Sequence, residues 1–420
     1  MWCERSRQRG VKAMSRLRDN SDFSRLFAAQ VTSLVGSGVT SIALAALAYQ
    51  LVGAEASTVV GFALTLRILA FVVLSPIAGV LADRVDRKRM LIAADLVRVG
   101  VMGAFPFITS VWQIYVLIFL VNAVTAFFTP TFEASIPELV GERLYTRAIS
   151  LSRVATDLEM VGGPLLAGLL IAVVGIRWTF WFDALTYVVS AVLVWRSYVP
   201  RAPKPTAPFP WHGFSAELAH GTREFLREPS LRAALLLHFA EAAAGAAAIV
   251  ATVVYVQSLL GRSETSFAVA MAAIGVGSSV AALTVARSSE RAITHAAAHR
   301  WARRILLTGG VLLCIALLPG PLRPPYPVFL ALWALNGAGQ AMIAVASVRL
   351  LAENTPPVER GRVYAAHFAL THLCWLVTYP AAGILSGRIG VPWMFAVAGV
   401  TALLMTAVAA SIRTTTAAHV

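Results

Sequence analysis

Two acidic residues, Glu159 and Glu241, stand inside long apolar segments with no Lys or Arg one helical turn away. An ionisable group at bilayer depth costs about 2.5–3.5 kcal/mol even on insertion scales, so its presence there indicates a function. A carboxyl in such surroundings can bind a proton on one side of a membrane and release it on the other. The sequence therefore predicts proton-carrying roles for both acids. Glu159 is the first choice, because it replaces a small residue in a segment of packing residues.

Other charged residues in the same segments have a partner at helical spacing. Asp95 and Arg98 are three residues apart, and Arg153 and Asp157 are four apart. Residues at these spacings share a helix face and can neutralise each other. We therefore expect a structural Asp95–Arg98 pair. Asp157 is kept as a third proton-carrying candidate, although it has Arg153 as a local partner.

Histidines and one arginine add polar groups at similar depth. His238 lies one turn before Glu241 on the same face, which predicts a hydrogen-bonded pair with either a structural or a transport role. Arg67 has no helical partner, so we expect it to bind an anionic substrate or to pair with an acid across a cavity. His367 and His372 are five residues apart and point in different directions, so they form no metal pair by themselves.

A cavity lined by several helices would bring these groups together. Asn336 and Gln340 share a helix face, where amides line cavities or bridge helices. The residues predicted to line the cavity are Arg67, His238, Asn336, Gln340 and His372. A metal site would need ligands from several helices, such as His372, His238, Glu241 and Glu159. No metal or cofactor site is predicted from the sequence itself.

The elements that must position these side chains are membrane helices. The chain of 420 residues is 58% hydrophobic and 13% charged, too apolar for a soluble protein of this size. A helix needs about 20 apolar residues to cross a bilayer. The sequence predicts twelve such spans, at 24–51, 58–82, 89–109, 111–130, 149–174, 178–198, 232–259, 265–286, 301–319, 326–351, 363–387 and 391–412.

Charge sets the predicted orientation. The chain carries 35 Lys and Arg against 21 Asp and Glu, a net charge of +14. Only four of these cations, Arg177, Arg262, Arg323 and Arg388, fall in predicted outer loops. An excess of Lys and Arg marks the cytoplasmic side, so membrane topology rather than nucleic-acid binding explains the charge. Both termini are predicted in the cytoplasm.

Composition also divides the chain. A basic tail covers 1–22, and a proline-rich stretch followed by an amphipathic helix at 214–231 forms a linker over 199–231. The linker separates an N-terminal bundle of six helices at 23–198 from a C-terminal bundle at 232–412, with a short tail at 413–420. Small residues at Gly275–Ser279 are expected at a helix contact rather than in a hydrolytic site.

The loop Gly79–Arg89 carries an ordered pattern of glycine, acid and bases between the second and third spans. The pattern Gly-x-Leu-Ala-Asp-Arg-x-x-Arg-Lys-Arg resembles the signature loop of major facilitator superfamily transporters. That resemblance implies a gating role for this loop. The residues concerned are Gly79, Asp83, Arg84, Arg87 and Arg89, and the basic cluster is expected to stay in water and lipid headgroups.

A second motif supports the same family. Gly163, Pro164 and Gly168 resemble the antiporter motif of major facilitator exporters, with Glu159 and Ala167 in place of two of its glycines. Gly-Pro bends a helix and permits close packing. The resemblance implies an all-α membrane protein with twelve helices in two pseudo-symmetric six-helix bundles around a central site.

The resemblance also implies an activity. We expect a monomeric, proton-coupled exporter of small amphiphilic or toxic compounds in the plasma (inner) membrane. Some stretches, such as Thr371–Trp375, are similar to a branch with nickel-resistance exporters, so divalent-metal export is the alternative. Uptake, or a receptor that does not transport, is less expected. No phosphate-binding loop and no enzyme site are recognised.

Overall fold

The computed structural model describes residue 17 and residues 20–82, 85–199, 211–289, 295–355 and 360–412. These residues form helices and no strand. The whole predicted C-terminal tail, most of the predicted N-terminal tail, the proline-rich part of the linker, and Asp83 and Arg84 of the loop motif lie outside the described residues. The all-α class predicted from composition is therefore confirmed.

Every predicted span falls on a helix. The helices that carry spans are α2 (Ser21–Val52), α3 (Ala56–Ala82), α4 (Arg87–Ala104), α5 (Val111–Val174), α6 (Ile176–Trp195), α8 (Pro229–Val254), α9 (Glu264–Ser289), α10 (His295–Leu317), α11 (Tyr326–Asn354), α12 (Arg360–Ile389) and α13 (Val391–Ser411). The predicted fourth and fifth spans both lie in α5, because the residues that connect them are also helical. Ten described segments are long and apolar enough to cross a membrane, and one of them, Ser21–Leu74, contains the first predicted span and most of the second.

The predicted amphipathic helix is present as α7 (Trp211–Arg227), but it ends earlier than expected. Pro229 occupies the first turn of α8, and the Glu228 carboxylate accepts a hydrogen bond from the Ser230 backbone N–H at 3.3 Å. Proline fits the first turn of a helix and cannot continue the preceding one. Leu231, predicted in the linker helix, therefore belongs to α8.

The chain groups into two compact units. Unit 1 contains residues 1–43 and 69–209, and unit 2 contains residues 44–68 and 210–420. The end of α2 and the first half of α3 thus belong with the C-terminal helices rather than with the rest of 23–198. The predicted bundle boundaries stay a prediction.

A buried polar network fixes the helices of unit 1. Asp95 and Arg98 form the ion pair that their spacing predicts, and both side chains are almost fully buried. Ser190 of α6 donates to Asp95 Oδ2 at 2.8 Å. The Arg98 guanidinium lies 4.2 Å from the Phe128 ring centroid and 4.5 Å from that of Tyr187. Because Asp95 accepts a hydrogen bond from α6 and Arg98 lies against rings of α5 and α6, the ion pair holds α4 against these two helices.

We expect Asp95→Ala to destabilise the protein strongly, because it leaves the Arg98 guanidinium buried without its counter-ion. Breaking one partner of a buried pair typically costs about 3–5 kcal/mol. Thermal unfolding of the purified protein in detergent checks this. Glu224→Ala, which removes an exposed i,i+3 pair with Arg227, is the control and should change the melting temperature little. Equal melting temperatures for the two variants would contradict the structural role of the Asp95–Arg98 pair.

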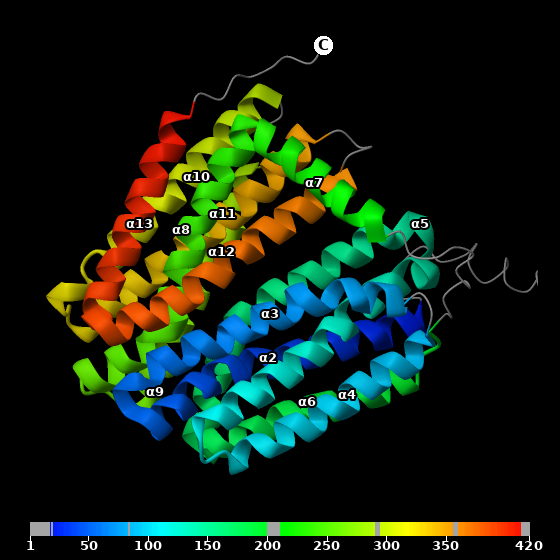
Figure 1. Cartoon of the computed structure of the whole chain (residues 1–420), viewed down its shortest axis with the longest axis horizontal. Coiled ribbons are helices and arrows are strands. Elements are labelled where there is room, and N and C mark those ends of the chain that lie inside the picture. The colour runs from blue at the N-terminus through cyan, green and yellow to red at the C-terminus, as the bar shows by residue number, and fades with distance from the viewer. Residues whose placement is uncertain are drawn as a thin grey trace, which may run out of the picture. The chain divides into compact units, whose positions relative to one another are not determined.

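Unit 2 packs around α8 and α11. Figure 1 shows α8 among α10, α11, α12 and α13, and the helices α12 and α13 both pack on it. The end of α8 continues into a π-helical turn, Tyr255–Leu259, whose Tyr255 ring stacks on Phe329 with centroids 4.9 Å apart. Phe329 in turn contacts Trp333, and Trp333 donates its indole N–H to Thr252 Oγ1 at 3.0 Å. These rings hold α8 and α11 at a fixed distance.

Glycines bring α9 and α11 into backbone contact. A Cβ placed on Gly277 would overlap the Ala334 carbonyl, and one placed on Gly337 would overlap the Ile274 carbonyl. The two contacts are reciprocal, since each glycine meets the carbonyl three residues before the other. Tyr326 at the start of α11 donates its hydroxyl to the Ser266 carbonyl near the start of α9 at 2.8 Å, so the two helices run parallel. The small residues predicted at a helix contact in Gly275–Ser279 lie at this crossing.

Candidate functional site

The polar residues of unit 2 gather on α8, α11, α12 and the first half of α3. Glu241 is the thirteenth residue of α8 and Asn336 the eleventh of α11. At 1.5 Å per residue, these positions lie about 15–18 Å from the helix starts, which is half the thickness of a bilayer core of about 30 Å. The polar cluster therefore lies at mid-membrane depth in this unit.

Glu241, His238 and His367 form a hydrogen-bonded chain. His238 Nδ1 lies 2.7 Å from Glu241 Oε2, as the i,i+3 spacing predicts. On its other side, His238 Nε2 lies 3.2 Å from His367 Nε2 of α12. Phe225 of α7 covers His367, with ring centroids 5.9 Å apart. One carboxyl and two imidazoles thus stand in line between α8 and α12.

Two amides and an aromatic ring stand beside this chain. Gln340 donates its amide N–H to Asn336 Oδ1 at 3.0 Å. Asn336 is fully buried, and its amide nitrogen has no hydrogen-bond partner among the described residues. Gly245, one turn beyond Glu241, makes room for both neighbours, since an added Cβ would overlap the Trp375 ring and lie 3.1 Å from Gln340 Oε1. The cluster therefore contains unused hydrogen-bonding capacity.

Arg67 of α3 and His372 of α12 belong to the same unit. The Arg67 guanidinium acts electrostatically on His372 and on Tyr379. His372 Nδ1 donates to the Phe368 carbonyl at 2.8 Å, which leaves Nε2 as its other polar atom. Arg67 is half-buried and has no ion pair or hydrogen bond within the part of the chain that the structure describes. All five predicted cavity residues thus lie in unit 2.

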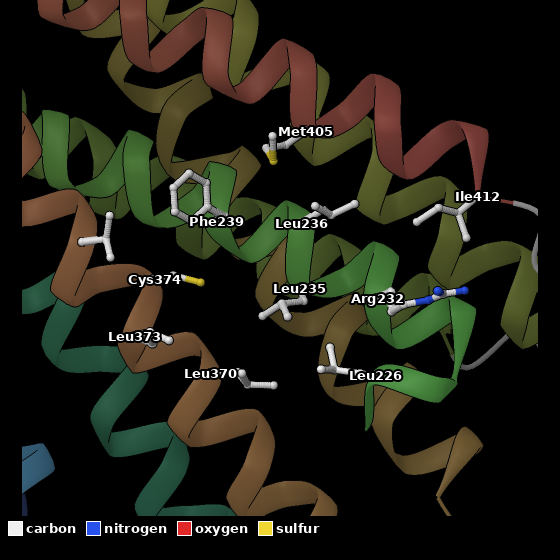
Figure 2. Close-up of a pocket in the computed structure, with 11 residues that line it drawn as sticks. Leu226, Arg232, Leu235, Leu236, Phe239, Leu370, Leu373, Cys374, Met405 and Ile412 are labelled. Atoms are coloured by element: carbon white, nitrogen blue, oxygen red, sulfur yellow. The ribbon is translucent and has the colours of Figure 1, made fainter. Parts of the chain in front are cut away.

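The face of α12 opposite to His372 and Trp375 lines an apolar groove of about 700 Å³ (Figure 2). Figure 2 shows Leu370, Leu373 and Cys374 of α12 facing α8 across this groove. Leu373 is 54% exposed, and Arg232, near the start of α8, is the one charged residue among the described residues that line the groove. The groove residues recur every three to four positions, as on one helix face. The groove thus forms part of the apolar surface of the unit and is distinct from the polar cluster.

In unit 1, Glu159 lies half-buried on α5 beside α2. Its Cγ would stand 3.1 Å from a Cβ placed on Gly38, and it has at least one interaction partner within the chain. Gly163, one turn further, meets the Gly38 backbone closely, since an added Cβ would lie 2.7 Å from Gly38 Cα. Gly168 lies on the same helix. The side chains of Asp157 and Pro164 lie outside the described residues.

The loop motif is described only in its second half. Asp86 caps α4, because its carboxylate accepts the Arg89 backbone N–H at 3.1 Å. Arg87 forms an ion pair with Glu138 of α5, with 2.8 Å between Nη1 and Oε1, and the Arg87 side chain is only 5% exposed. The expectation that the basic cluster stays in water is therefore wrong for Arg87, because the carboxylate of Glu138 compensates its charge in a buried position. The burial of Gly79, and Asp83 and Arg84 as a whole, lie outside what the structure describes.

Sequence reasoning missed two members of the cluster. His367 and Trp375 are 129 and 130 residues from their partners on α8, so helical spacing gives no signal for either contact. The one sequence signal for the Trp375 contact is Gly245, the small residue on α8 that makes room for its ring. The described residues contain no group of three His, Cys, Asp or Glu side chains placed to hold a metal ion.

Comparisons with known proteins agree with this architecture. The model of the Major Facilitator Superfamily matches residues 26–298 and 293–419. The multidrug efflux pump Tap of Mycolicibacterium fortuitum is 26% identical over 396 residues, which cover 91% of this chain and 93% of Tap. The enterobactin exporter EntS of Shigella dysenteriae serotype 1 (strain Sd197) is 26% identical over 369 residues, with 85% and 83% covered.

A solved structure has the same fold. The crystal structure of a bacterial homologue of the human lysosomal transporter Spinster superposes with a TM-score of 0.70 at 14% identity, covering 95% of this chain and 97% of that one. The family match extends over nearly the whole sequence, and the structure contains the long apolar helices that a membrane transporter requires. The chain therefore belongs to the Major Facilitator Superfamily and is a multi-pass membrane transporter rather than an enzyme.

Proposed function

We propose that this transporter exports small amphiphilic compounds across the plasma membrane in exchange for protons, as a monomer with both termini in the cytoplasm. Two relatives that align over most of the chain are named for export, one of multiple drugs and one of enterobactin. The exporter-like motif of α5 also favours export, and its Gly163 packs closely against Gly38 of α2.

The observation that carries the proposal is the Glu241–His238–His367 chain. When Glu241 is ionised, its carboxylate accepts the His238 Nδ1–H. In neutral His238 the other nitrogen, Nε2, then has no proton, so His367 Nε2–H donates to it. In this state the chain carries one negative charge.

One added proton fits the same geometry. With His238 protonated on both nitrogens, Nδ1–H still donates to Glu241 and Nε2–H now donates to His367, which holds its own proton on Nδ1. Both hydrogen bonds persist and the net charge falls to zero. The chain can therefore take up and release a proton without losing a bond, and each step changes the charge beside Trp375 and Gln340. Such a change at mid-membrane depth can favour one state of a two-state transporter over the other.

Everted membrane vesicles test the proposal. Vesicles that contain the protein should accumulate an amphiphilic dye when their interior is acidified, and a protonophore should release it. Vesicles without the protein are the control. A panel of anionic, neutral and cationic dyes covers the substrate classes. A compound to which the protein confers resistance, but which no vesicle preparation concentrates under a proton gradient, would exclude proton-driven export.

A further inference from the structure

Arg67 is a cation at mid-membrane depth that has no counter-ion in the part of the chain that the structure describes. It is the twelfth residue of α3, about 16 Å from the helix start. Intramembrane arginines are rare and almost always pair or face a polar cavity. Arg67 has no ion pair or hydrogen bond within the described part of the chain, and the acid of its own unit at similar depth, Glu241, is hydrogen bonded to His238.

Contacts N-terminal to Arg67 place this part of α3 beside α12. Thr58 of α3 donates its hydroxyl to the Gly383 carbonyl at 3.1 Å. One turn further along α3, a Cβ on Gly61 would stand 2.8 Å from the Tyr379 carbonyl oxygen. Residue numbers rise on α3 while they fall on α12, so the two segments are antiparallel. The same register carries Arg67 to the level of Trp375, which agrees with its electrostatic effect on His372 and Tyr379.

The α12 residues at the level of Arg67 are aromatic, and Arg67 acts electrostatically on two of them, His372 and Tyr379. The Trp375 and Tyr379 rings lie with centroids 5.1 Å apart. His372 directs its Nδ1–H to a backbone carbonyl, so it supplies no negative charge. A guanidinium beside a pair of rings offers a fork of N–H donors next to a flat apolar surface. An organic anion with an aromatic body matches both parts, because carboxylates and sulfonates accept two parallel N–H bonds from arginine.

We propose that Arg67 is the anion-binding residue of the transport site, and that the substrate is an aromatic organic anion whose ring system lies on Trp375, the half-buried ring that packs against buried Tyr379. This inference rests on the proposed function, since it names the substrate class of the same polar cluster. The negative charge of the substrate would neutralise Arg67 during passage, which explains why the cation has no fixed partner among the residues that the structure describes.

Binding of a matched pair of dyes to the purified protein in an uncharged detergent tests the inference. The pair is 8-anilinonaphthalene-1-sulfonate, an anion, and N-phenyl-1-naphthylamine, which has the same rings without the sulfonate. The wild type should bind the anion more tightly than the neutral dye. Arg67→Gln should weaken binding of the anion about tenfold or more, the effect of losing a charge-assisted pair, and leave the neutral dye unchanged. Arg67→Lys should retain most of the anion's affinity.

Arg232→Gln is the matched control, because it removes the cation of the apolar groove with the same substitution. It should leave binding of both dyes unchanged. The inference is overturned if Arg67→Gln binds the anion like the wild type, if only Arg232→Gln loses it, or if the wild type does not prefer the anion. If Arg67→Gln binds neither dye, the result for Arg67→Lys is used instead. The inference is supported if Arg67→Lys binds the anion more tightly than the neutral dye, and it is overturned if Arg67→Lys shows no such preference.

The assay separates this inference from the proposed function, because equilibrium binding needs neither a gradient nor a direction. A protein that binds the anion through Arg67 but does not concentrate it in acidified vesicles would contradict proton-driven export alone. A protein that concentrates cationic or neutral dyes, with no preference for the anion, would support export and overturn the role of Arg67.

Discussion

Gly337→Ala is expected to prevent stable packing of α9 against α11, although it adds only one methyl group. That methyl would overlap the Ile274 carbonyl oxygen and stand 2.7 Å from the carbonyl carbon, both of them backbone atoms that cannot rotate away. The helices must separate instead, and overpacking of this kind costs about 1–3 kcal/mol, occasionally more. Gly277→Ala should have a similar effect through the Ala334 carbonyl. Thermal unfolding in detergent, followed by the recovery of monodisperse protein, measures both.

Gly100→Ala in α4 is the control for this prediction, because nothing lies within 4 Å of a Cβ at that position. Alanine in a helix interior is more favourable than glycine by about 0.5–1 kcal/mol. The same substitution should therefore stabilise the protein slightly at position 100 and destabilise it strongly at positions 277 and 337. A Gly337→Ala protein that melts at or above the wild-type temperature would contradict the close crossing of α9 and α11.

The helices could be predicted from the sequence because the bilayer imposes a simple requirement. Each span must be apolar over about 20 residues, and this is visible in any window of the chain. The end of α7 was not predicted at the right residue, because Pro229 can start α8 as well as it can follow a loop. Residues 131–148, which connect the fourth and fifth predicted spans, are helical in the structure. They are polar enough that the sequence alone predicts a loop there.

The candidate site could be predicted only where contacts are local. The Asp95–Arg98 and His238–Glu241 pairs are both three residues apart, and the structure contains both. The His238–His367 and Thr58–Gly383 contacts join residues 129 and 325 positions apart, and only tertiary packing brings them together. Arg87 shows the same limit, since its burial depends on Glu138, which lies on another helix. Local spacing therefore identified one of the two hydrogen bonds in the Glu241–His238–His367 chain and none of the register between α3 and α12.

The structure also changes the order of the coupling candidates. Glu159 is the first choice from the sequence because it replaces a small residue in a segment of packing residues, and in the structure it has an interaction partner within the chain. Glu241 is bonded to a group that can itself take up a proton. A carboxyl linked to two imidazoles can exchange a proton through hydrogen bonds that already exist, so we now place Glu241 first and keep Glu159 as the alternative.

Glu241→Gln is expected to abolish proton-driven accumulation of substrate in acidified everted vesicles, while exchange of substrate down its own gradient continues. The glutamine amide oxygen can still accept the His238 Nδ1–H, so the hydrogen bond and the size of the side chain are kept. The glutamine has no negative charge and does not titrate, so protonation of the two imidazoles no longer neutralises a carboxylate. The chain then loses the change from one negative charge to none that would favour one state over the other.

Glu55→Gln is the matched control, because Glu55 is an exposed acid in the short turn Gly53–Glu55 outside the cluster. It should accumulate substrate like the wild type. Glu159→Gln, measured in the same vesicles, separates the two candidates. If Glu159→Gln fails to accumulate substrate and Glu241→Gln succeeds, coupling belongs to the carboxyl of unit 1. If both variants concentrate substrate normally, neither acid carries the coupling proton, because removing a titrating group from the transport cycle cannot leave gradient-driven accumulation intact.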